Sequence, residues 1–382
     1  FVEHMMFKGT KKRPTYLEIS RELDAHGAEY NAFTSKDYTG YYIKIDAKQQ
    51  ELGFDVLSDM VFNSKFDVEE VKKEKGVIIE ELRMYDDNPI MKIDSLYESL
   101  IFTGHELGRD VGGVAKTFRG VSRDELYDYY KKYYTPQNMV LVLAGNIDLK
   151  KINKYLQYFE KGNFKKYHPQ TKKFNKFVFP QKKLDWEEKI KVETRKIDQA
   201  HLIIGFPGIK YTDKKRFALS VLLSVLSGGM SSRLFVEVRE KRGLAYMVRA
   251  GSEPFVDAGT IYVQAGLDPA RLKEAIVVIK NELVKIAKEE ISQHELKDAK
   301  NNLIGRLALS LEDSSEIAGW YAKKFWFAKS LETPDELIKE IKKVKVNDVK
   351  ELAQELFEFD KLRVALIGPV KKQELLKILI ST

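Results

Sequence analysis

The chain opens with Phe1-Val2-Glu3-His4-Met5-Met6-Phe7-Lys8-Gly9-Thr10, which places a carboxylate beside an imidazole at the head of an apolar, helix-compatible run. A Glu-His pair by itself is usually a solvated surface pair. The residues around Glu3 and His4 therefore decide whether this stretch carries chemistry and a recognisable fold.

Composition limits the classes of protein that this chain can belong to. It has 382 residues, of which 43% are hydrophobic, and this is enough for two domains with folded cores. It has no cysteine, so disulfides and thiolate ligands are excluded and any metal must be held by His, Asp or Glu. This composition fits a reducing compartment, and we expect a cytoplasmic protein. No apolar run approaches the ~20 residues of a membrane-spanning helix, so we expect no membrane span.

The formal net charge is +8, a value that nucleic-acid-binding proteins also reach. Here the lysines come as scattered pairs interleaved with acidic residues, such as Lys11-Lys12 and Lys131-Lys132. Such a pattern is typical of solvated protein faces, so we expect no nucleic-acid partner.

Local signals predict the first helices and strands. Thr15 with Glu18 three residues later forms a capping box, and the helix that it opens should reach about His26 and stop at Gly27. Aromatic and β-branched residues then predict two strands, followed by a further helix. These three elements are expected at residues 28–35, 38–45 and 49–62.

A second informative stretch covers residues 71–85, VKKEKGVIIEELRMY. Helical spacing predicts a single apolar stripe on this segment, formed by Glu74, Val77, Ile78, Glu81 and Tyr85, with Glu80 on the polar flank. A carboxylate on a core-facing stripe is costly unless a cation or hydrogen-bond donors compensate it. Glu74 and Glu81 therefore either serve a site, or pair with a lysine, or lie at the margin of the core.

The second half of the chain repeats the pattern of the first. A helix opening near residue 121 leads into an apolar strand at 138–145, and a helix opening near residue 346 leads likewise into an apolar strand at 362–368. One copy in each half indicates a duplicated domain. We divide the chain into a first domain at 1–165, which carries Glu3, His4, Glu74 and Glu81, a basic linker at 166–185 and a homologous second domain at 186–382.

Five blocks of sequence together carry a family likeness. They are residues 3–10, 31–34, 74–81, 105–109 and 239–246. With these blocks the chain resembles the inverzincin zinc peptidases of the pitrilysin and mitochondrial-processing-peptidase group, especially the small bacterial members that have two domains per chain.

The resemblance assigns roles to individual residues. In the family pattern His-x-x-Glu-His, both histidines lie on one helical face and bind zinc. This chain shows the last two members, and the first would lie one position before Phe1. The resemblance implies that His4 and Glu81 are zinc ligands, that Glu3 is the general base, and that Glu74 is a second carboxylate supporting the site. A catalytic zinc needs three protein ligands, so we expect weak or absent zinc binding by residues 1–382 alone.

The resemblance also implies how a substrate is held. Asn31, Ala32 and Phe33 are similar to the edge strand on which these enzymes bind their substrates backbone to backbone. Arg239 and Tyr246, from the second half, resemble the pair that steadies the substrate and the oxyanion.

The expected fold is two homologous α+β domains, each a largely antiparallel sheet packed with helices, forming a clamshell around a chamber. The expected function is a zinc-dependent endopeptidase that hydrolyses extended or unfolded peptides, and the resemblance makes a homodimer plausible. The alternative is a non-catalytic family member that serves as a structural or substrate-binding subunit.

Overall fold

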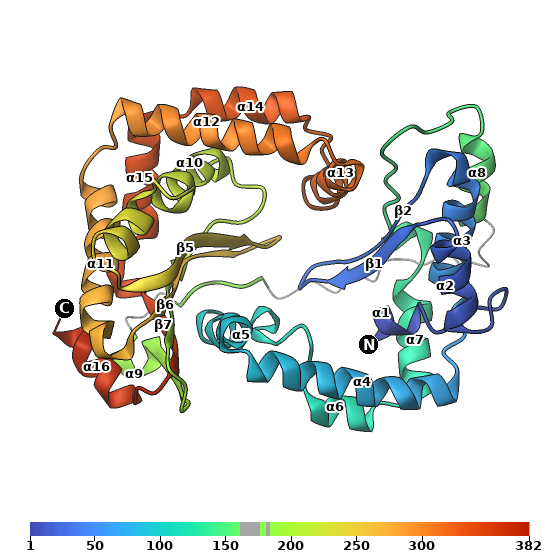
Figure 1. Cartoon of the computed structure of the whole chain (residues 1–382), viewed down its shortest axis with the longest axis horizontal. Coiled ribbons are helices and arrows are strands. Elements are labelled where there is room, and N and C mark those ends of the chain that lie inside the picture. Colours follow the sequence, from blue (N-terminus) through green and yellow to red (C-terminus); the bar gives the residue numbers. More distant parts are fainter. Residues whose placement is uncertain (161–175, 181–183, 382) are drawn as a thin grey trace. The chain divides into compact units, whose positions relative to one another are not determined.

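The computed structural model describes residues 1–160, 176–180 and 184–381. The chain forms two compact units, each assembled from separate stretches of sequence. Unit 1 comprises Phe1–Met84, Val111–Phe174 and Asp313–Lys329, and unit 2 comprises Tyr85–Asp110, Asn175–Glu312 and Ser330–Thr382. Figure 1 shows both units and labels most of their helices and strands.

The described part of unit 1 is mainly helical, with one pair of strands. Its helices are α1 (Val2–Met5), α2 (Tyr16–Asp24), α3 (Gln50–Asn63), α4 (Val68–Asp87, whose last residues belong to unit 2), α6 (Ala115–Gly120), α7 (Arg123–Tyr133), α8 (Ile152–Glu160) and α13 (Ser314–Ala328), with short 3₁₀ turns η1 (Ala47–Gln49) and η3 (Pro136–Asn138). The strands β1 (Glu29–Thr34) and β2 (Thr39–Lys44) pair antiparallel, from Glu29 opposite Lys44 to Thr34 opposite Thr39.

Two apolar clusters hold unit 1 together. One joins α2 to α3 through the buried side chains Ile19, Leu23, Val56 and Met60. The other surrounds α1 and is formed by Val2, Met5, Met6, Phe66, Val71, Leu126 and Tyr130. Met5 and Met6 are completely buried, so the first turn of the chain is fixed in the core of its unit.

Most local predictions for unit 1 are confirmed, because they rest on signals within a few residues. Both strands and the helix α3 lie within a few residues of their predicted bounds, and α2 begins with the predicted Thr15–Glu18 capping box. The strand predicted at 138–145 is wrong: residues 139–144 are only partly buried and form no strand. A strand needs a hydrogen-bonded neighbour. Within the described part of unit 1, β1 and β2 pair only with each other.

Unit 2 contains the larger sheet and the longer helices. Its helices are α5 (Pro89–Ile101), α9 (Trp186–Lys189), α10 (Arg216–Ser227), α11 (Leu272–Lys288), α12 (Gln293–Ser310), α14 (Pro334–Lys343), α15 (Val346–Leu356) and α16 (Lys372–Ile380). Its strands are β3 (Ile190–Thr194), β4 (Ala200–Pro207), β5 (Ala245–Pro254), β6 (Gly259–Leu267) and β7 (Arg363–Gly368). Short turns lie at η2 (Glu106–Gly108), η4 (Phe235–Glu240, π-helical), η5 (Pro269–Arg271) and η6 (Phe359–Lys361).

The sheet of unit 2 runs in the order β3-β7-β4-β6-β5. Only β3 and β7 pair in parallel, and the other neighbours are antiparallel. Alternate residues of β4 face opposite sides: Leu202 and Ile204 join the core under α10, α11 and α15, whereas Ile203 packs against α5. The prediction of a largely antiparallel sheet packed with helices is confirmed for this unit.

The two elements predicted for the repeat in the second half are confirmed: the helix α15 begins at Val346, and the strand β7 covers Arg363–Gly368. Superposition of the two halves and the domain division at 165 and 186 remain predictions. The predicted linker, 166–185, lies largely outside the described residues, and within its described part Phe177 and Phe179 pack against Phe102. None of the described helices combines the length and the apolar character that crossing a membrane requires.

Candidate functional site

The predicted catalytic pair lies on α1, a helix of four residues. The backbone N–H groups of Met6 and Phe7 donate to the carbonyl oxygens of Glu3 and His4, each at 3.2 Å. Because the methionines that follow are buried, the side chains of Glu3 and His4 are left at the half-buried face of the helix. The position of these two groups is therefore set by core packing rather than by a mobile terminus.

His4 lies between two carboxylates of α4. Its Nδ1 is 2.8 Å from Glu74 Oε1, and its Nε2 is 3.4 Å from Glu81 Oε2. Two ligands of a tetrahedral zinc ion, each ~2.0–2.1 Å from the metal, lie about 3.3–3.4 Å apart. The structure thus brings His4 to Glu74 and Glu81, which follow it in the sequence by 70 and 77 residues.

Glu74 is nearly completely buried, with 3% of its surface exposed. Its second oxygen, Oε2, lies 2.6 Å from Lys8 Nζ. Burial alone would raise the pKa of Glu74, but the hydrogen bonds from His4 and Lys8 outweigh it and lower the pKa. Glu74 therefore accepts a hydrogen bond from His4 Nδ1–H, and Nε2 is the ring nitrogen that faces Glu81 and could hold a metal.

Glu3 has a partner on the strand β1. The Thr34 hydroxyl donates a hydrogen bond to Glu3 Oε2, which fixes the carboxylate beside His4. Neither Thr34 nor Lys8 was predicted as a site residue. Both belong to the sequence blocks that carry the family resemblance. Lys8 follows His4 by four residues, and this spacing was the signal from which a role of Lys8 near His4 could have been predicted.

The turn after α1 requires the glycine at position 9. Gly9 has φ +112°, and a Cβ added to it would lie 2.4 Å from the carbonyl oxygen of Pro14. The Gly9 carbonyl accepts from the backbone N–H of Lys65 at 3.1 Å. This turn determines the direction in which Lys8 leaves α1.

A buried ionic cluster anchors the same turn. Arg13 donates to Asp59 at 3.0 Å, to Asp55 at 2.7 Å and to Glu22 at 2.6 Å. The Thr10 hydroxyl donates to Asp59 at 2.5 Å. Thr10, Arg13 and Asp59 are buried. A buried charge is costly without a partner, and here the Asp59 carboxylate is compensated by Arg13 and Thr10.

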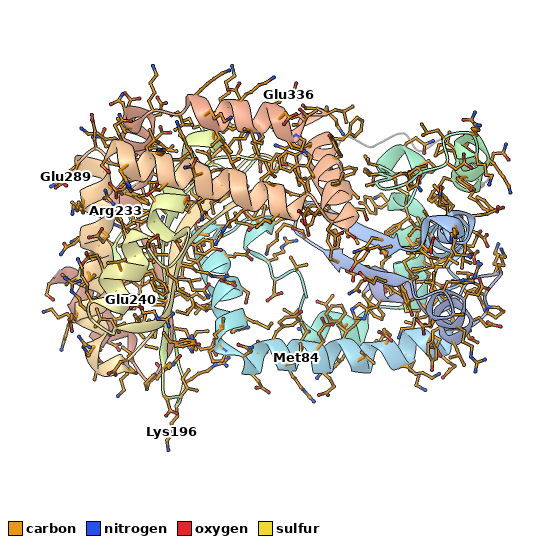
Figure 2. The ribbon with its side chains drawn as sticks, turned by 45° about the horizontal axis from the view of Figure 1, so that its top comes forward. Met84, Lys196, Arg233, Glu240, Glu289 and Glu336 are labelled. Carbon is orange, nitrogen blue, oxygen red and sulfur yellow. The ribbon has the colours of Figure 1, made fainter. Side chains whose placement is uncertain are left out.

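The stripe predicted on α4 is confirmed only in part. Val71, Glu74 and Ile78 are buried, but Val77 is 52% exposed and Tyr85 is also exposed. The buried positions follow spacings of three and four residues, and Val77 lies on the flank of that narrow stripe. Near the C-terminal end of α4 the side chains are solvated, as Met84 is (Figure 2).

Asn31, Ala32 and Phe33 lie on β1, as predicted. The strand β1 pairs with β2, and within the described residues of unit 1 no strand pairs with its other edge. The backbone N–H of Ala32 donates to Asn31 Oδ1 at 2.8 Å, and Phe33 is 45% exposed. An edge of this kind can accept an additional extended strand.

Arg239 and Tyr246 lie in unit 2, where η4 turns into β5. Gly243 has φ +60° between them, at the turn that leads from η4 into β5. The Arg239 guanidinium lies 5.1 Å from the centre of the Tyr246 ring, and Tyr246 is 79% exposed. The structure therefore brings these two predicted residues together.

The residues of unit 1 fit two positions of a zinc site. His4 Nε2 and Glu81 Oε2 have the chemistry and separation of two ligands, and Glu74 orients the histidine. Within residues 1–160, 176–180 and 184–381, no group of three or more His, Asp or Glu side chains could hold a metal ion. The described residues thus supply two donors, one fewer than a catalytic zinc requires.

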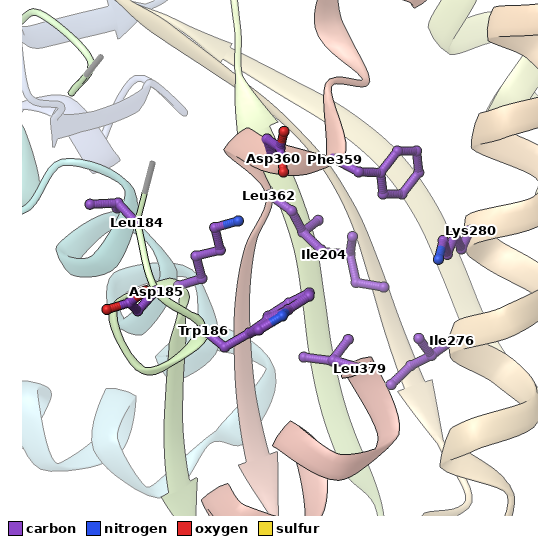
Figure 3. Close-up of a pocket in the computed structure, with 11 residues that line it drawn as sticks. Leu184, Asp185, Trp186, Ile204, Ile276, Lys280, Phe359, Asp360, Leu362 and Leu379 are labelled. Atoms are coloured by element: carbon purple, nitrogen blue, oxygen red, sulfur yellow. The ribbon is translucent and has the colours of Figure 1, made fainter. Parts of the chain in front are cut away.

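A separate cavity of about 290 Å³ lies in unit 2. Its walls include Trp186, Ile204 and Leu379 together with the charged side chains Lys280 and Asp360 (Figure 3). None of the predicted site residues lines it.

Comparison with known proteins identifies the family. Residues 1–113 match the family described as insulinase (peptidase family M16), and residues 120–303 match the peptidase M16 inactive domain. A protein of Streptomyces coelicolor named an uncharacterized zinc protease is 34% identical over 375 residues, which are 98% of this chain and 81% of that protein. The chain belongs to peptidase family M16. The resemblance found in the sequence is thereby confirmed.

Further relatives support the assignment to family M16. YmxG of Bacillus subtilis, also named an uncharacterized zinc protease, is 35% identical over 97% of this chain and 87% of its own length. A crystal structure titled peptidase M16 inactive domain, from Pseudomonas fluorescens, has a TM-score of 0.87 at 20% identity and covers 97% of this chain and 88% of its own. A protease from Helicobacter pylori has a TM-score of 0.85 at 22% identity, with 96% and 88% covered. These two structures confirm the fold.

Proposed function

We propose that this M16 protein is a zinc-dependent endopeptidase that hydrolyses extended or unfolded peptides. One observation supports this proposal most: a single imidazole, His4, has one nitrogen on the buried Glu74 and the other facing Glu81, with Glu3 beside it. A histidine held in this way by a carboxylate is typical of metal sites.

His4 and Glu81 would hold the zinc, and the family pattern assigns the remaining ligand to a histidine directly before Phe1. When bound, zinc acts as a Lewis acid that activates water and polarises a peptide carbonyl. Cysteine-free composition agrees with such a set of nitrogen and oxygen donors.

The chain's own groups would perform the remaining tasks. Glu3 accepts the proton of the attacking water and later delivers it to the leaving amine. Thr34 keeps the Glu3 carboxylate in position for this transfer. The unpaired edge of β1, with Asn31 and Ala32, binds the substrate backbone, which requires an extended peptide.

Arg239 and Tyr246 are proposed to steady the substrate and the developing oxyanion, on the basis of the family resemblance and of their mutual contact. A homodimer and a location in the cytoplasm also remain predictions of the sequence. Substrate turnover by variants of Tyr246 provides the test of this role.

Replacement of the proposed base tests the function. Glu3→Gln in the natural full-length protein should keep zinc and lose peptide hydrolysis by about 100-fold or more, because a general base acts in the chemical step and does not hold the metal. Glu69→Gln, an exposed change at the start of α4, is the matched control and should leave both unchanged. Turnover by Glu3→Gln close to that of the wild type would remove Glu3 from the mechanism.

The alternative function is a non-catalytic subunit that binds peptides. It is favoured by one observation, namely that the described residues contain no complete metal-binding group. Natural full-length protein that binds an extended peptide, but neither retains zinc nor hydrolyses the peptide, would support this alternative over the peptidase.

A further inference from the structure

Lys8 contacts the carboxylate that orients His4. The chain turns after α1, with the Lys8 backbone N–H donating to the carbonyl oxygen of Met5 at 3.2 Å. From this turn the Lys8 ammonium reaches Glu74 Oε2 at 2.6 Å, while His4 Nδ1 lies 2.8 Å from Glu74 Oε1. Two side chains four residues apart therefore hold the two oxygens of one carboxylate.

The burial of Glu74 makes both contacts necessary. A buried carboxylate that loses one of two partners retains an oxygen without a donor, which is costly away from water. With Lys8 on Oε2, the carboxylate cannot rotate about its Cγ–Cδ bond without breaking both contacts. Oε1 is thereby directed at the histidine ring.

We propose that Lys8 is a positioning residue for the site: it holds Glu74 so that Glu74 fixes the ring of His4 with Nε2 toward Glu81. Lys8 touches neither the proposed metal ligand atoms nor the base. Its expected effect on zinc affinity rests on the proposed function, whereas its effect on the His4 hydrogen bond does not.

The first measurement is zinc affinity, determined by competition with a chelator on the natural full-length protein. Lys8→Met should weaken zinc binding by about 10- to 100-fold, the usual cost of losing a partner behind a metal ligand. Lys8→Arg should bind zinc nearly as the wild type does, because it restores a cationic donor. Lys12→Met is the matched control: Lys12 pairs with Asp55 outside the site, and its loss should leave zinc affinity unchanged.

The second measurement uses zinc-free protein labelled with ¹⁵N-histidine, with the His4 signals assigned through His4→Ala. At one neutral pH, a slowly exchanging Nδ1–H proton of His4 should be present in the wild type, Lys8→Arg and Lys12→Met, and absent in Lys8→Met. A purely structural role of Lys8 would lower thermal stability without this selective loss. If Lys8→Met does not fold, Lys8→Gln takes its place in both measurements.

The outcomes separate the two proposals. Zinc affinity and a His4 Nδ1–H signal that both survive in Lys8→Met would overturn the positioning role. Wild-type protein that binds no zinc, but whose His4 signal depends on Lys8, would overturn the proposed function and leave the positioning role in place.

Discussion

Replacing Gly9 by alanine should destabilise unit 1 and misplace the residues on both sides of the turn. A non-glycine residue at φ +112° costs about 1–3 kcal/mol. The added Cβ would also lie 2.4 Å from the Pro14 carbonyl oxygen, about 1 Å shorter than ordinary van der Waals contact, and the neighbour is backbone that cannot rotate away. Overpacking of this kind adds about 1–3 kcal/mol, so the total loss should be about 2–6 kcal/mol.

Urea denaturation followed by circular dichroism measures this loss as a lower unfolding midpoint. Gly76→Ala is the matched control, because Gly76 lies in α4 with open space around the added methyl group. That change should stabilise by about 0.5–1 kcal/mol through helix propensity. A Gly9→Ala midpoint equal to that of the wild type, alongside a raised Gly76→Ala midpoint, would refute the proposed constraint on the turn.

Two further predictions concern unit 2. Tyr246→Phe should leave zinc content unchanged and lower hydrolysis by ~10- to 1,000-fold if its hydroxyl donates to the oxyanion, and unchanged kinetics would remove Tyr246 from catalysis. The ion pair between Arg233, labelled in Figure 2, and Glu295 should make stability depend on acid: the Arg233 hydrogen bonds hold the pKa of Glu295 at about 2, below its unfolded value of about 4.3. The contribution of this ion pair to the free energy of unfolding is complete above the unfolded pKa of Glu295 and disappears as the pH falls toward 2. Because the carboxylate is partly exposed, we expect this contribution to be about 1–2 kcal/mol. Glu295→Gln should flatten the unfolding free energy between pH 5 and 3, and an unaltered slope would contradict the assignment.

Elements with local signals could be predicted from the sequence. The capping box at Thr15 lies where its spacing indicates, and the aromatic and β-branched residues located β1 and β2. The apolar run at 138–145 failed because a strand depends on a partner elsewhere in the chain, which sequence periodicity does not reveal.

Contacts between distant segments were also beyond local prediction. The stripe on α4 indicated that Glu74 needs a cation or hydrogen-bond donors, but not that Lys8, 66 residues earlier, is one of its partners. Likewise α13 belongs to unit 1, where Lys44 pairs with Asp313 at 2.9 Å, although α13 follows most of unit 2 in the sequence. The site residues themselves were predicted from motifs, whereas the groups that hold them, Lys8 and Thr34, required the structure.

The zinc affinity of the natural full-length protein with Glu81→Gln, beside Glu80→Gln, tests the central claim most directly. The two carboxylates are neighbours on α4, but Glu81 faces His4 Nε2 at 3.4 Å, whereas Glu80 pairs with Arg83 at 2.6 Å on the exposed flank. If His4 and Glu81 are ligands of one zinc ion, Glu81→Gln should weaken zinc binding by more than about 100-fold, beyond the loss typical of an outer partner, and Glu80→Gln should not change it. Wild-type zinc affinity in Glu81→Gln, or an equal loss in both variants, would contradict the proposed site.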